Sequence, residues 1–565
     1  MNKISSKKNT DRKKIVLAAL NASYIHSNPA LYALRRSAYA YLEKAEDTGA
    51  AEEPFIELAE YTVNDRYEDI LFDLIGREAG MIGLSVYIWN SQFCLQLLAD
   101  LRRLHPQEEG LILFAGGPEA ETHSEQYLAY CDFVMTGPGE YTFSRICGRF
   151  AAKESAADLW KDLPGIVFKE DGIVRNVPPK AENNRRFEKE LPFLYDGSED
   201  FEHRIIYYES SRGCPFRCTY CLSSEETGLV FRDMETVRKE LQFFLDRKVS
   251  LVKFVDRTFN AGTARAREIW NYIRQHDNGV TGFHFEIGAD LLTEEDIILL
   301  KSLRPGLVQL EIGIQSTNPE TLQAIRRTAD NKKIFHAVRE LLENQNIALH
   351  TDLIAGLPYE DLSSFRNSFD EVYALRAHQF QVGFLKVLSG TEMERRAEEY
   401  GIVSSVKPPY TVLSTRWITP HQIDRIRKAA DMVDMFWNSG LFRHALPYLE
   451  SLFESPFAMY EALAVYYKEQ KGNEALSPRL RGTFLEQFAE REKKASAFDS
   501  VYFKELLRFD ERLHFHPSRR MTASDTFRFP DGKCVRAEFD YSVKHPVTKE
   551  AAYRFYEEDG GTEHE

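Results

Sequence analysis

Three cysteines within eight residues give this chain its clearest chemical signal. Cys214, Cys218 and Cys221 stand in the spacing CxxxCxxC. Thiolates are the usual ligands of iron–sulfur clusters, whereas a closed structural metal site holds four protein ligands. The next cysteine along the chain is Cys534, so a [4Fe–4S] cluster bound here would keep one iron open to a substrate or cofactor. Two other interpretations stay open: three core cysteines on a loop, and a zinc site completed by a distant histidine.

The composition limits the class of protein. Seven cysteines among 565 residues are too few for a disulfide framework and are typical of a reducing compartment. The formal net charge of −15 gives no support to nucleic-acid binding by charge. The apolar runs are shorter than the roughly 20 residues of a membrane span, and no secretory signal is visible. We therefore expect a cytoplasmic protein with sizeable cores, no membrane partner and a disordered acidic end.

The first 150 residues alternate apolar strand-like segments with helix-like segments. The predicted strands lie near 14–20, 81–87, 111–115 and 133–135. Continuous apolar strands separated by helices predict a parallel, doubly wound, Rossmann-like α/β sheet. Ligands of such sheets bind outside the carboxyl ends of the strands. Gly116, Gly117 and Gly137 follow two of those ends, where a ligand could approach the backbone, although a glycine there is also an ordinary turn residue.

The centre of the chain holds six further strand–helix units. The strands are expected near 205–210, 251–256, 282–288, 308–314, 348–355 and 380–388. Six such units in about 200 residues predict a partial (βα)6 barrel of the TIM type, whose active site lies at the carboxyl ends of its strands. The cysteine motif follows the first of these strands. Thr293 with Asp296, and Asn318 before Pro319, mark helix starts.

These patterns divide the chain into five parts. Between the two α/β regions a hairpin with its turn at Asp171-Gly172 is expected, and the last part is mostly helical with a small hairpin near 525–535. The parts are a disordered basic tail over 1–14, a Rossmann-like domain over 15–152, a linker with the hairpin over 153–200, the barrel over 201–400 and a C-terminal domain over 401–565.

Placed at the end of the first barrel strand, the cysteine motif resembles the signature of the radical S-adenosylmethionine (SAM) superfamily. The resemblance covers roughly residues 205–395. It implies that the open iron binds the amino and carboxylate groups of SAM, and that one electron cleaves SAM to methionine and a 5′-deoxyadenosyl radical. The residues that it implies for SAM binding are Tyr220, Asp256, Glu286, Glu311, Gln315 and Gly356.

Some of these assignments have an alternative. Asp256, Glu286 and Glu311 could instead form structural salt bridges. Many relatives carry an arginine two residues after the third-strand glutamate, and here that position is Gly288. How the carboxylate or the ribose of SAM is held is therefore open.

The N-terminal region resembles the cobalamin-binding domain of B12-dependent radical enzymes. The residues that match positions near the corrin are Ser85, Gly116, Gly117, Gly137 and Glu140. The Asp-x-His-x-x-Gly motif that supplies a lower axial histidine is absent, so no such histidine is expected to ligate cobalt. Tyr24, His26 and Asn28 follow the first strand and could face the ligand, although His26 could equally be a surface or capping residue.

The whole arrangement resembles a B12-binding radical SAM protein with a C-terminal domain of the DUF4080 type. The resemblance implies three cofactors: a [4Fe–4S] cluster, SAM and cobalamin. It also implies methyl transfer to, or radical rearrangement of, an unknown substrate, which could be a small molecule, with a reductant such as flavodoxin or ferredoxin. Catalytic residues are not identified. Two alternatives remain: a cobalamin-independent radical SAM enzyme, and a cobalamin or iron–sulfur sensor without turnover.

Related enzyme classes and one partner class fit the sequence less well. A methylthiotransferase needs a second cysteine triplet, but Cys94, Cys131 and Cys147 are too widely spaced and are predicted core residues. An enzyme with auxiliary clusters needs several cysteines after the barrel. A coproporphyrinogen oxidase has a fourth cysteine where this chain has Ser223. The short basic pairs Arg326-Arg327 and Arg519-Arg520 are interpreted as parts of a solvated face.

Overall fold

A computed structural model of the chain defines most of its helices and strands. It divides the chain into two compact units, Met1–Pro215 with Glu226–Arg257 and Ser405–Tyr410, and Phe216–Glu225 with Thr258–Ser404 and Thr411–Glu565. The acidic end, Arg519-Arg520 and all of the expected basic tail except Lys14 lie outside the described residues. The described residues are 14–46, 55–106, 110–152, 154–155, 158–180, 186–224, 228–492, 498–515, 521–528, 530 and 533–557.

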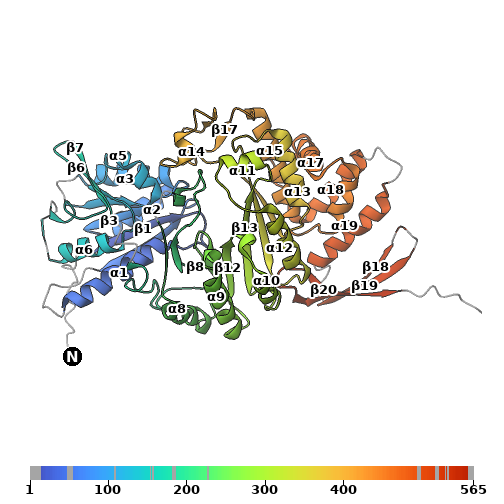
Figure 1. Ribbon diagram of the computed structural model, residues 1–565, viewed down its shortest axis with the longest axis horizontal. Coiled ribbons are helices and arrows are strands. Elements are labelled where there is room, and N and C mark those ends of the chain that lie inside the picture. The colour runs from blue at the N-terminus through green and yellow to red at the C-terminus, as the bar shows by residue number, and fades with distance from the viewer. Residues whose placement is uncertain are drawn as a thin grey trace, which may run out of the picture. The chain divides into compact units, whose positions relative to one another are not determined.

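The first unit contains a seven-stranded mixed sheet with the strand order β2-β1-β3-β4-β5-β6-β7 (Figure 1). The first five strands are parallel, and β6 and β7 are antiparallel. The bounds are β1 (Ile15–Asn21), β2 (Ile56–Thr62), β3 (Met81–Ser85), β4 (Ile112–Gly116), β5 (Phe133–Met135), β6 (Ile166–Glu170) and β7 (Ile173–Val177). The predicted Rossmann-like sheet is thus confirmed, in a mixed form.

Two features of this sheet were not predicted. Strand β2 alternates apolar and polar residues, because it is an edge strand with only one face fully covered. The hairpin β6–β7 was assigned to a linker, but β6 pairs with β5 and extends the sheet. The edge of β5 still offers backbone groups for pairing, so a hairpin that follows it in the chain can extend the same sheet.

Helices cover both faces of the first sheet. Two apolar cores result, one under α2 and α3 and the other under α1 and α6. Cys94, Cys131 and Cys147 are buried in these cores, so the prediction of core cysteines is confirmed. The helices are α1 (Pro29–Glu46), α2 (Tyr67–Gly76), α3 (Ser91–Leu104), α4 (Pro118–Thr122), α5 (Ser124–Tyr127) and α6 (Glu140–Ala151).

The six predicted barrel strands are present as a parallel sheet with the order β15-β14-β13-β12-β11-β8. The first unit supplies β8 (Ile205–Tyr208) and β11 (Leu251–Phe254), together with α8 (Met234–Asp246) and the antiparallel pair β9 (Ser211–Gly213) and β10 (Leu229–Phe231). The second unit supplies β12 (Gly282–Ile287), β13 (Val308–Gln315), β14 (Ala348–Ala355) and β15 (Gln379–Phe384). The open, partial barrel that the sequence predicted is confirmed.

Helices connect the second-unit strands, and alternate residues of β13 and β14 are buried. Both predicted helix starts are confirmed, since Thr293 and Asp296 form a capping box and Asn318 caps the helix that begins at Pro319. The helices are α9 (Thr263–Gln275), α10 (Glu294–Lys301), α11 (Pro319–Ala324), α12 (Asn331–Glu343) and α13 (Leu362–Tyr373).

The C-terminal part of the second unit is mainly helical, as predicted. Its longer helices are α15 (Pro420–Met432), α17 (Pro456–Lys471), α18 (Arg481–Glu492) and α19 (Ser500–His514). The chain then forms β18 (Thr522–Arg528), β19 (Cys534–Lys544) and β20 (Ala551–Glu557). The sequence predicted a hairpin here and missed β20, which completes a three-stranded sheet packed on α19.

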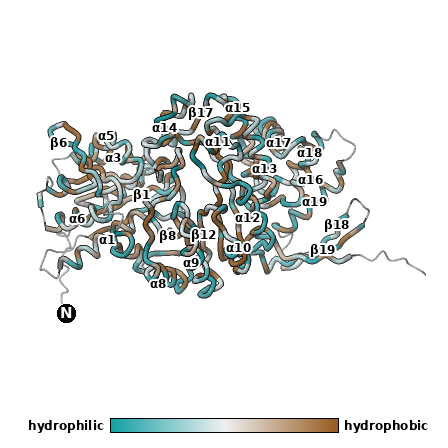
Figure 2. Tube along the Cα trace, in the orientation of Figure 1, coloured by the Kyte–Doolittle hydropathy of each residue, from teal (hydrophilic) through white to brown (hydrophobic). Residues whose placement is uncertain are grey.

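The hydropathy pattern follows this architecture (Figure 2). Hydrophobic residues follow the central strands, and hydrophilic residues are spread over the outer helices (Figure 2). In the part of the chain that the structure describes, no helix is long and apolar enough to cross a membrane.

A buried ion pair fixes α8 to the strands beside it. Arg232 Nε donates a hydrogen bond to Glu240 Oε2 at 2.8 Å, and both side chains are only 5% exposed. Tyr208 Oη donates to the same carboxylate, while the Arg232 guanidinium also donates to the carbonyls of Phe187 and Leu191. One guanidinium therefore holds β8, α8 and the segment before β8 together.

Replacing Arg232 should destabilise the protein strongly. In Arg232→Met, Glu240 stays buried without its cation, so we expect a loss of about 3–5 kcal/mol in the free energy of unfolding. Urea unfolding followed by fluorescence measures this change. The matched control is Lys239→Met, also on α8, whose ammonium pairs with Glu235 at the surface, so its loss should change the free energy of unfolding little. Equal losses in the two variants would contradict the assignment.

Candidate functional site

The carboxyl ends of β3, β4 and β5 lie side by side at one edge of the first sheet. After β3, the Asn90 side chain donates to the carbonyls of Leu20 and Ser85 and accepts from the Tyr87 amide. This locks the loop that presents Tyr87 and Trp89, whose rings stack with centroids 4.4 Å apart. Trp89 is 52% exposed. The edge therefore carries an aromatic surface that the sequence analysis did not single out.

The predicted glycines lie at this edge, and the chain itself requires one of them. Gly117 has φ +105°, and a Cβ there would lie 2.6 Å from the Val86 carbonyl oxygen. Only glycine fits such a close approach. Ser85 is buried and accepts a hydrogen bond from Asn28 Nδ2 at 3.1 Å, so the side chains of both residues are engaged within the protein.

The end of β5 presents Gly137 and the hydroxyl beside it. Gly137 has φ +64°. Next to it, Thr136 Oγ1 is buried and has no hydrogen-bond partner among the described residues. A buried polar atom without a partner is unfavourable unless a ligand or water satisfies it. The edge thus combines glycine backbone, an unsatisfied hydroxyl and the exposed ring of Trp89 stacked on Tyr87, which fits a large, planar ligand.

Glu140, predicted to contact the ligand, is engaged by the protein instead. Arg212 Nη2 donates to Glu140 Oε1 at 2.8 Å and also to Glu209. Burial would raise the pKa of Glu140, but the charge and hydrogen bond of Arg212 outweigh burial and hold that pKa below its ordinary value. Glu140 therefore joins helix α6 to the strand that precedes the cysteine motif.

The loop after β1 is joined to β8. His26 Nδ1 forms a hydrogen bond of 2.7 Å with Tyr207 Oη, and the Ile205 amide donates to the Ile25 carbonyl. Burial and the charge of Lys253 lower the pKa of His26. In the described structure His26 thus makes a structural contact to Tyr207. A role of His26 in facing the ligand stays a prediction. Tyr24 is exposed under the guanidinium of Arg204.

The three cysteines of the motif are free thiols divided between the two units. Cys214 directly follows β9 in the first unit, and Cys218 and Cys221 belong to the second. The Cys221 amide donates to the Cys218 carbonyl at 3.1 Å, which gives the latter pair a tight turn. Over the described residues no cluster of three or more His, Cys, Asp or Glu side chains is arranged to hold a metal ion. The structure brings Cys218 and Cys221 together, and the common role of all three stays a prediction.

Asp256 holds the strand that leads into Cys214. It accepts hydrogen bonds from the Ser210 amide (2.9 Å), the Ser210 hydroxyl (2.8 Å) and the Ser211 hydroxyl (2.5 Å). Burial raises the pKa of Asp256 to about 6 against the opposing effect of these donors. The predicted SAM contact is thus a buried acid that anchors β9 to the end of β11.

Arg327 is the main cation of the second-unit site. Its guanidinium donates to the Gly313 carbonyl, and it lies beside Cys218 and Tyr220. Burial raises the pKa of the Cys218 thiol, and Arg327 opposes that shift by favouring the thiolate. Burial likewise raises the pKa of Tyr220. The interpretation of Arg326-Arg327 as a solvated pair is therefore wrong for Arg327. Arg326 is exposed, and its guanidinium pairs with the Glu392 carboxylate.

Gln315 ends β13 in an unusual backbone conformation. Its φ is +72°, and the register between β13 and β14 shifts at Gly313/Gln315. Its Oε1 atom is buried and has no partner within the described residues. Thr219 Oγ1, next to Cys218 in the chain, is likewise buried without a hydrogen-bond partner among the described residues. Two thiols, an adjacent guanidinium and unsatisfied buried oxygens form a donor set that fits a thiolate-ligated cluster with a polar ligand beside it.

The predicted glutamates face each other on neighbouring strands. Glu286 of β12 is in register with Glu311 of β13, and His284 Nε2 lies 3.0 Å from Glu311 Oε2. The alternative of a structural pair therefore has support for Glu311. Gly356 follows β14 with φ +84°, where a Cβ would lie 2.6 Å from Val412 Cγ1. At Gly288, where relatives carry arginine, the backbone exchanges two hydrogen bonds with the Asn260 side chain.

Sequence reasoning missed three residues near these sites. Nothing in a short basic pair distinguishes half-buried Arg327 from exposed Arg326, so no local signal could have found it. Trp89 and Glu360 did carry a signal, because both follow a buried strand of a parallel sheet. Glu360 is buried and follows Gly356 by four residues.

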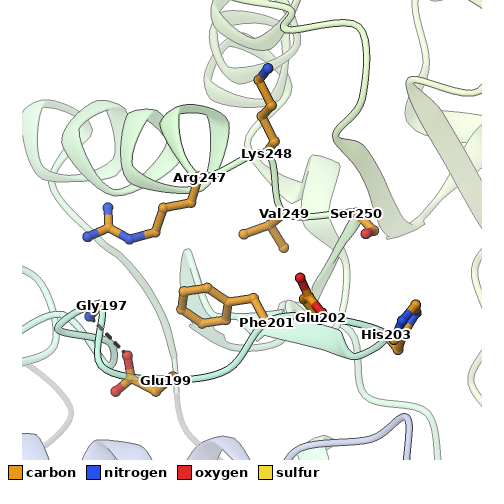
Figure 3. Close-up of a pocket in the computed structure, with 9 residues that line it drawn as sticks. All are labelled: Gly197, Glu199, Phe201, Glu202, His203, Arg247, Lys248, Val249 and Ser250. Atoms are coloured by element: carbon orange, nitrogen blue, oxygen red, sulfur yellow. Dashed lines mark hydrogen bonds between the residues drawn. The ribbon is translucent and has the colours of Figure 1, made fainter.

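A cavity of about 580 Å³ lies at the opposite, amino ends of β8 and β11 (Figure 3). Phe201, Glu202 and His203 line it from the segment before β8, and Arg247 and Lys248 line it from the end of α8 (Figure 3). Since the cysteine motif follows the carboxyl end of the sheet, this cavity is not the predicted site.

Three protein families match successive parts of the chain. Residues 19–147 match the B12 binding domain, residues 208–372 match the Radical SAM superfamily, and residues 398–525 match a protein family of unknown function, DUF4080. The chain therefore carries the three regions that its sequence resembled.

Distant relatives share the first two regions. The chain is 24% identical over 332 residues to 2-(S-pantetheinyl)-carbapenam-3-carboxylate methyltransferase from Streptantibioticus cattleyicolor, covering 53% of this chain and 45% of that protein. It is 24% identical over 355 residues to the cobalamin-dependent radical SAM methyltransferase TokK from Streptomyces tokunonensis, covering 59% and 51%. The chain thus spans about half the length of these two relatives.

A solved structure has the same fold. The cobalamin-dependent SAM radical enzyme OxsB, with aqua-cobalamin and SAM bound, matches with a TM-score of 0.58 at 17% identity. The match covers 88% of this chain and 79% of OxsB. At this identity the likeness establishes the fold alone.

Removing the Asp256 carboxylate should loosen the segment before Cys214. In Asp256→Ala the Ser210 amide loses its buried acceptor, so we expect a loss of about 1–3 kcal/mol and faster hydrogen exchange in peptides covering 209–214. Hydrogen–deuterium exchange with mass spectrometry measures this locally. Asp246→Ala is the control, because its exposed carboxylate accepts only from Gln242 on the same helix. Unchanged exchange in Asp256→Ala would show that the acid does not anchor β9.

Proposed function

We propose that this chain, which joins a B12 binding domain to a radical SAM domain and a DUF4080 region, is a cobalamin-dependent radical SAM enzyme that methylates a small organic molecule. The observation that carries the proposal is the position of Arg327. It links the Cys218 thiol to the Gly313 carbonyl, and so joins the cysteine motif to the strand end that bears Gln315.

The residues of the motif take the metal in this proposal. Cys214, Cys218 and Cys221 would hold a [4Fe–4S] cluster, and Arg327 would stabilise the thiolate at Cys218. When bound, the cluster, SAM and cobalamin supply a one-electron reduction, a carbon-centred radical and a transferable methyl group. The chain's own task is to bind these groups, orient them and keep water away.

The strand ends of the barrel would orient SAM. Gln315 has a buried oxygen without a partner in the described residues, which makes it the best-supported contact. The side chains of Tyr220, Glu286 and Glu311, and the backbone at Gly356, complete the predicted set. Asp256 acts in this proposal through β9, since its described contacts are Ser210 and Ser211.

The edge of the first sheet would bind cobalamin. The Tyr87–Trp89 stack offers an apolar surface for a planar macrocycle, and the backbone of Gly116, Gly117 and Gly137 lies at the same edge of the sheet. His26 is engaged by Tyr207. Together with the missing Asp-x-His-x-x-Gly motif, this favours a cobalamin whose lower face carries no histidine of that kind.

Methyl transfer is favoured over radical rearrangement by the two relatives named above as methyltransferases. The proposal includes an external one-electron donor of the flavodoxin or ferredoxin type. A small-molecule substrate is supported by the relative named as a methyltransferase of 2-(S-pantetheinyl)-carbapenam-3-carboxylate. A chain of net charge −15 offers no general electrostatic attraction to nucleic acid.

Anaerobic reconstitution with iron, sulfide and cobalamin tests the cofactors. We expect about four irons and one corrin per chain, with iron lost in Cys214→Ala, Cys218→Ala or Cys221→Ala because each removes a thiolate ligand. Corrin should stay bound in those variants, and Cys534→Ala, on β19, should keep both. Metal analysis and ultraviolet–visible spectra give the counts.

The same preparation tests turnover. With dithionite and SAM, the holoenzyme should form 5′-deoxyadenosine, or S-adenosylhomocysteine if methyl transfer reloads cobalamin. Four irons without corrin would overturn the cobalamin assignment, and one zinc in place of iron would overturn the radical chemistry. Both cofactors bound without any turnover of SAM would favour a sensor.

The aromatic pair should determine corrin binding. Trp89→Ala removes the exposed ring, so we expect at least a tenfold loss of cobalamin affinity with the iron content unchanged, as stacked aromatic contacts contribute about 1–3 kcal/mol. Fluorescence quenching during cobalamin titration measures it. Phe72→Ala, at an exposed aromatic residue of α2, is the control. Equal affinity in Trp89→Ala and the parent would place the corrin elsewhere.

A further inference from the structure

Glu360 is a buried acid that the proposed function does not use. It lies between β14 and α13, four residues after Gly356, and is 1% exposed. Ser316 Oγ donates to its Oε1 at 2.5 Å, and Ser368 Oγ donates to the same atom at 3.4 Å. Oε2 is buried and has no hydrogen-bond partner among the described residues. A carboxyl group in such surroundings is much less costly when neutral than when ionised.

This carboxyl joins the segments that follow two neighbouring barrel strands. Ser316 and Thr317 follow β13, and the Thr317 amide donates to Ser368 Oγ on α13 at 3.0 Å. Asn318 Nδ2 donates to the Tyr359 carbonyl at 2.8 Å, beside Glu360. We call this set the β13–β14 clamp; its members are Ser316, Thr317, Asn318, Tyr359, Glu360 and Ser368.

The charged surroundings of Glu360 are acidic. Burial raises the pKa of Glu360 to about 8, Asp361 adds to the shift, and the hydroxyls of Ser316 and Ser368 oppose it only in part. The clamp side chains that donate to Glu360 are the hydroxyls of Ser316, after β13, and Ser368, on α13. In the described residues no arginine or lysine is paired with Glu360. The carboxyl therefore stays protonated near neutral pH.

The clamp bears on the conformation of Gln315. A left-handed backbone at a residue other than glycine costs on the order of 1 kcal/mol and persists only where neighbours hold it. Three side chains do so: Arg327 bonds the Gly313 carbonyl, Asn331 Nδ2 bonds the Ser316 carbonyl, and Glu360 bonds the Ser316 hydroxyl.

We propose that Glu360, as a neutral acid, is a positioning residue that fixes the Gln315–Ser316 strand end for the ligand of the barrel. That this ligand is SAM rests on the proposed function. On ionisation the hydroxyls of Ser316 and Ser368 would still donate to Glu360, but its uncompensated charge in a buried site would favour opening of the clamp to water and so loosen Gln315. Ligand binding should therefore have an alkaline limit that this one group sets.

Unfolding of the cofactor-free chain tests the clamp without reference to any ligand. The folded protein keeps a proton on Glu360 up to about pH 8, whereas the ordinary pKa of the group is 4.5. Between these values the folded state binds the extra proton, so this group makes stability fall as pH rises. Glu360→Gln cannot ionise. Its unfolding midpoint, relative to the parent, should rise from pH 5 to pH 8 and level off above.

The matched control is Glu371→Gln, an exposed glutamate on α13, whose difference from the parent should not change with pH. A flat difference for Glu360→Gln would overturn the proposal, because the acid would then ionise like an exposed one.

Binding of SAM to the reconstituted enzyme tests the consequence. In the parent, affinity should fall about tenfold per pH unit above pH 8, and in Glu360→Gln it should stay level. Glu360→Leu lacks the hydrogen bond and should bind SAM at least tenfold more weakly at every pH with its iron retained. If Glu360→Leu does not fold, Ser316→Ala removes the same hydrogen bond from the other side.

The two arms separate the clamp from the proposed function. If the unfolding arm behaves as expected but the reconstituted parent binds no SAM at any pH, the proposed function fails and the clamp stands. If the parent binds SAM and Glu360→Gln shows the same alkaline loss as the parent, the clamp is not the cause and the proposal is overturned.

Discussion

The hydrogen bond from Arg327 to the Gly313 carbonyl is the contact on which the second-unit site depends. A guanidinium presents several donors in one plane, so it can satisfy a backbone carbonyl and lie beside a thiol at once. Its position beside Cys218 favours the thiolate that a metal requires. Burial still leaves the pKa of Cys218 above its ordinary value, so Arg327 offsets only part of the effect of burial on this thiol.

The first unit positions its part of the site by different means. Asn90, a neutral side chain, bonds the ends of β1 and β3 and thereby holds the loop that presents Trp89. Ion pairs hold the neighbouring segments together. Arg212 joins Glu140 to Glu209, and Arg204 joins the segment before β8 to Glu60. The edge where a ligand would bind is thus lined by backbone, hydroxyl and aromatic surface, while charges are paired within the protein.

The strands could be predicted wherever burial on both faces made them continuously apolar, as in β1, β3 and β4. The prediction missed β2 and β20, because each is an edge strand whose pattern is diluted by solvent-facing residues. It placed the β6–β7 hairpin correctly along the chain but could not know its partner, since pairing with β5 is set in three dimensions.

The residues of the candidate site also divide into those that could be predicted from the sequence and those that could not. The cysteines could be found because their spacing is local, and the strand-end residues because a parallel sheet gathers such ends. Arg327 could not be separated from Arg326, since the backbone after the short helix α11, where Arg326 has φ +53°, decides which of two adjacent arginines turns toward Gly313. The ion pair of Glu140 likewise depends on Arg212, a residue 72 positions away.

Two buried acids beside the barrel strand ends show how hydrogen-bond donors replace cations. Asp256 accepts from two hydroxyls and one backbone amide, and its pKa rises only to about 6. Glu360 accepts from two hydroxyls alone, and its pKa rises to about 8. Asp256 has three donors within 2.9 Å, whereas Glu360 has one short donor and a second at 3.4 Å. More short hydrogen bonds to the charged form favour the carboxylate, which is the direction of the difference between the two acids. If the barrel binds SAM as proposed, a neutral anchor adds no charge beside the strand end that would hold its amino and carboxylate groups. Arginine in the place of a clamp hydroxyl would have fixed the same segments, but it would also have competed with Arg327 for every anionic group nearby.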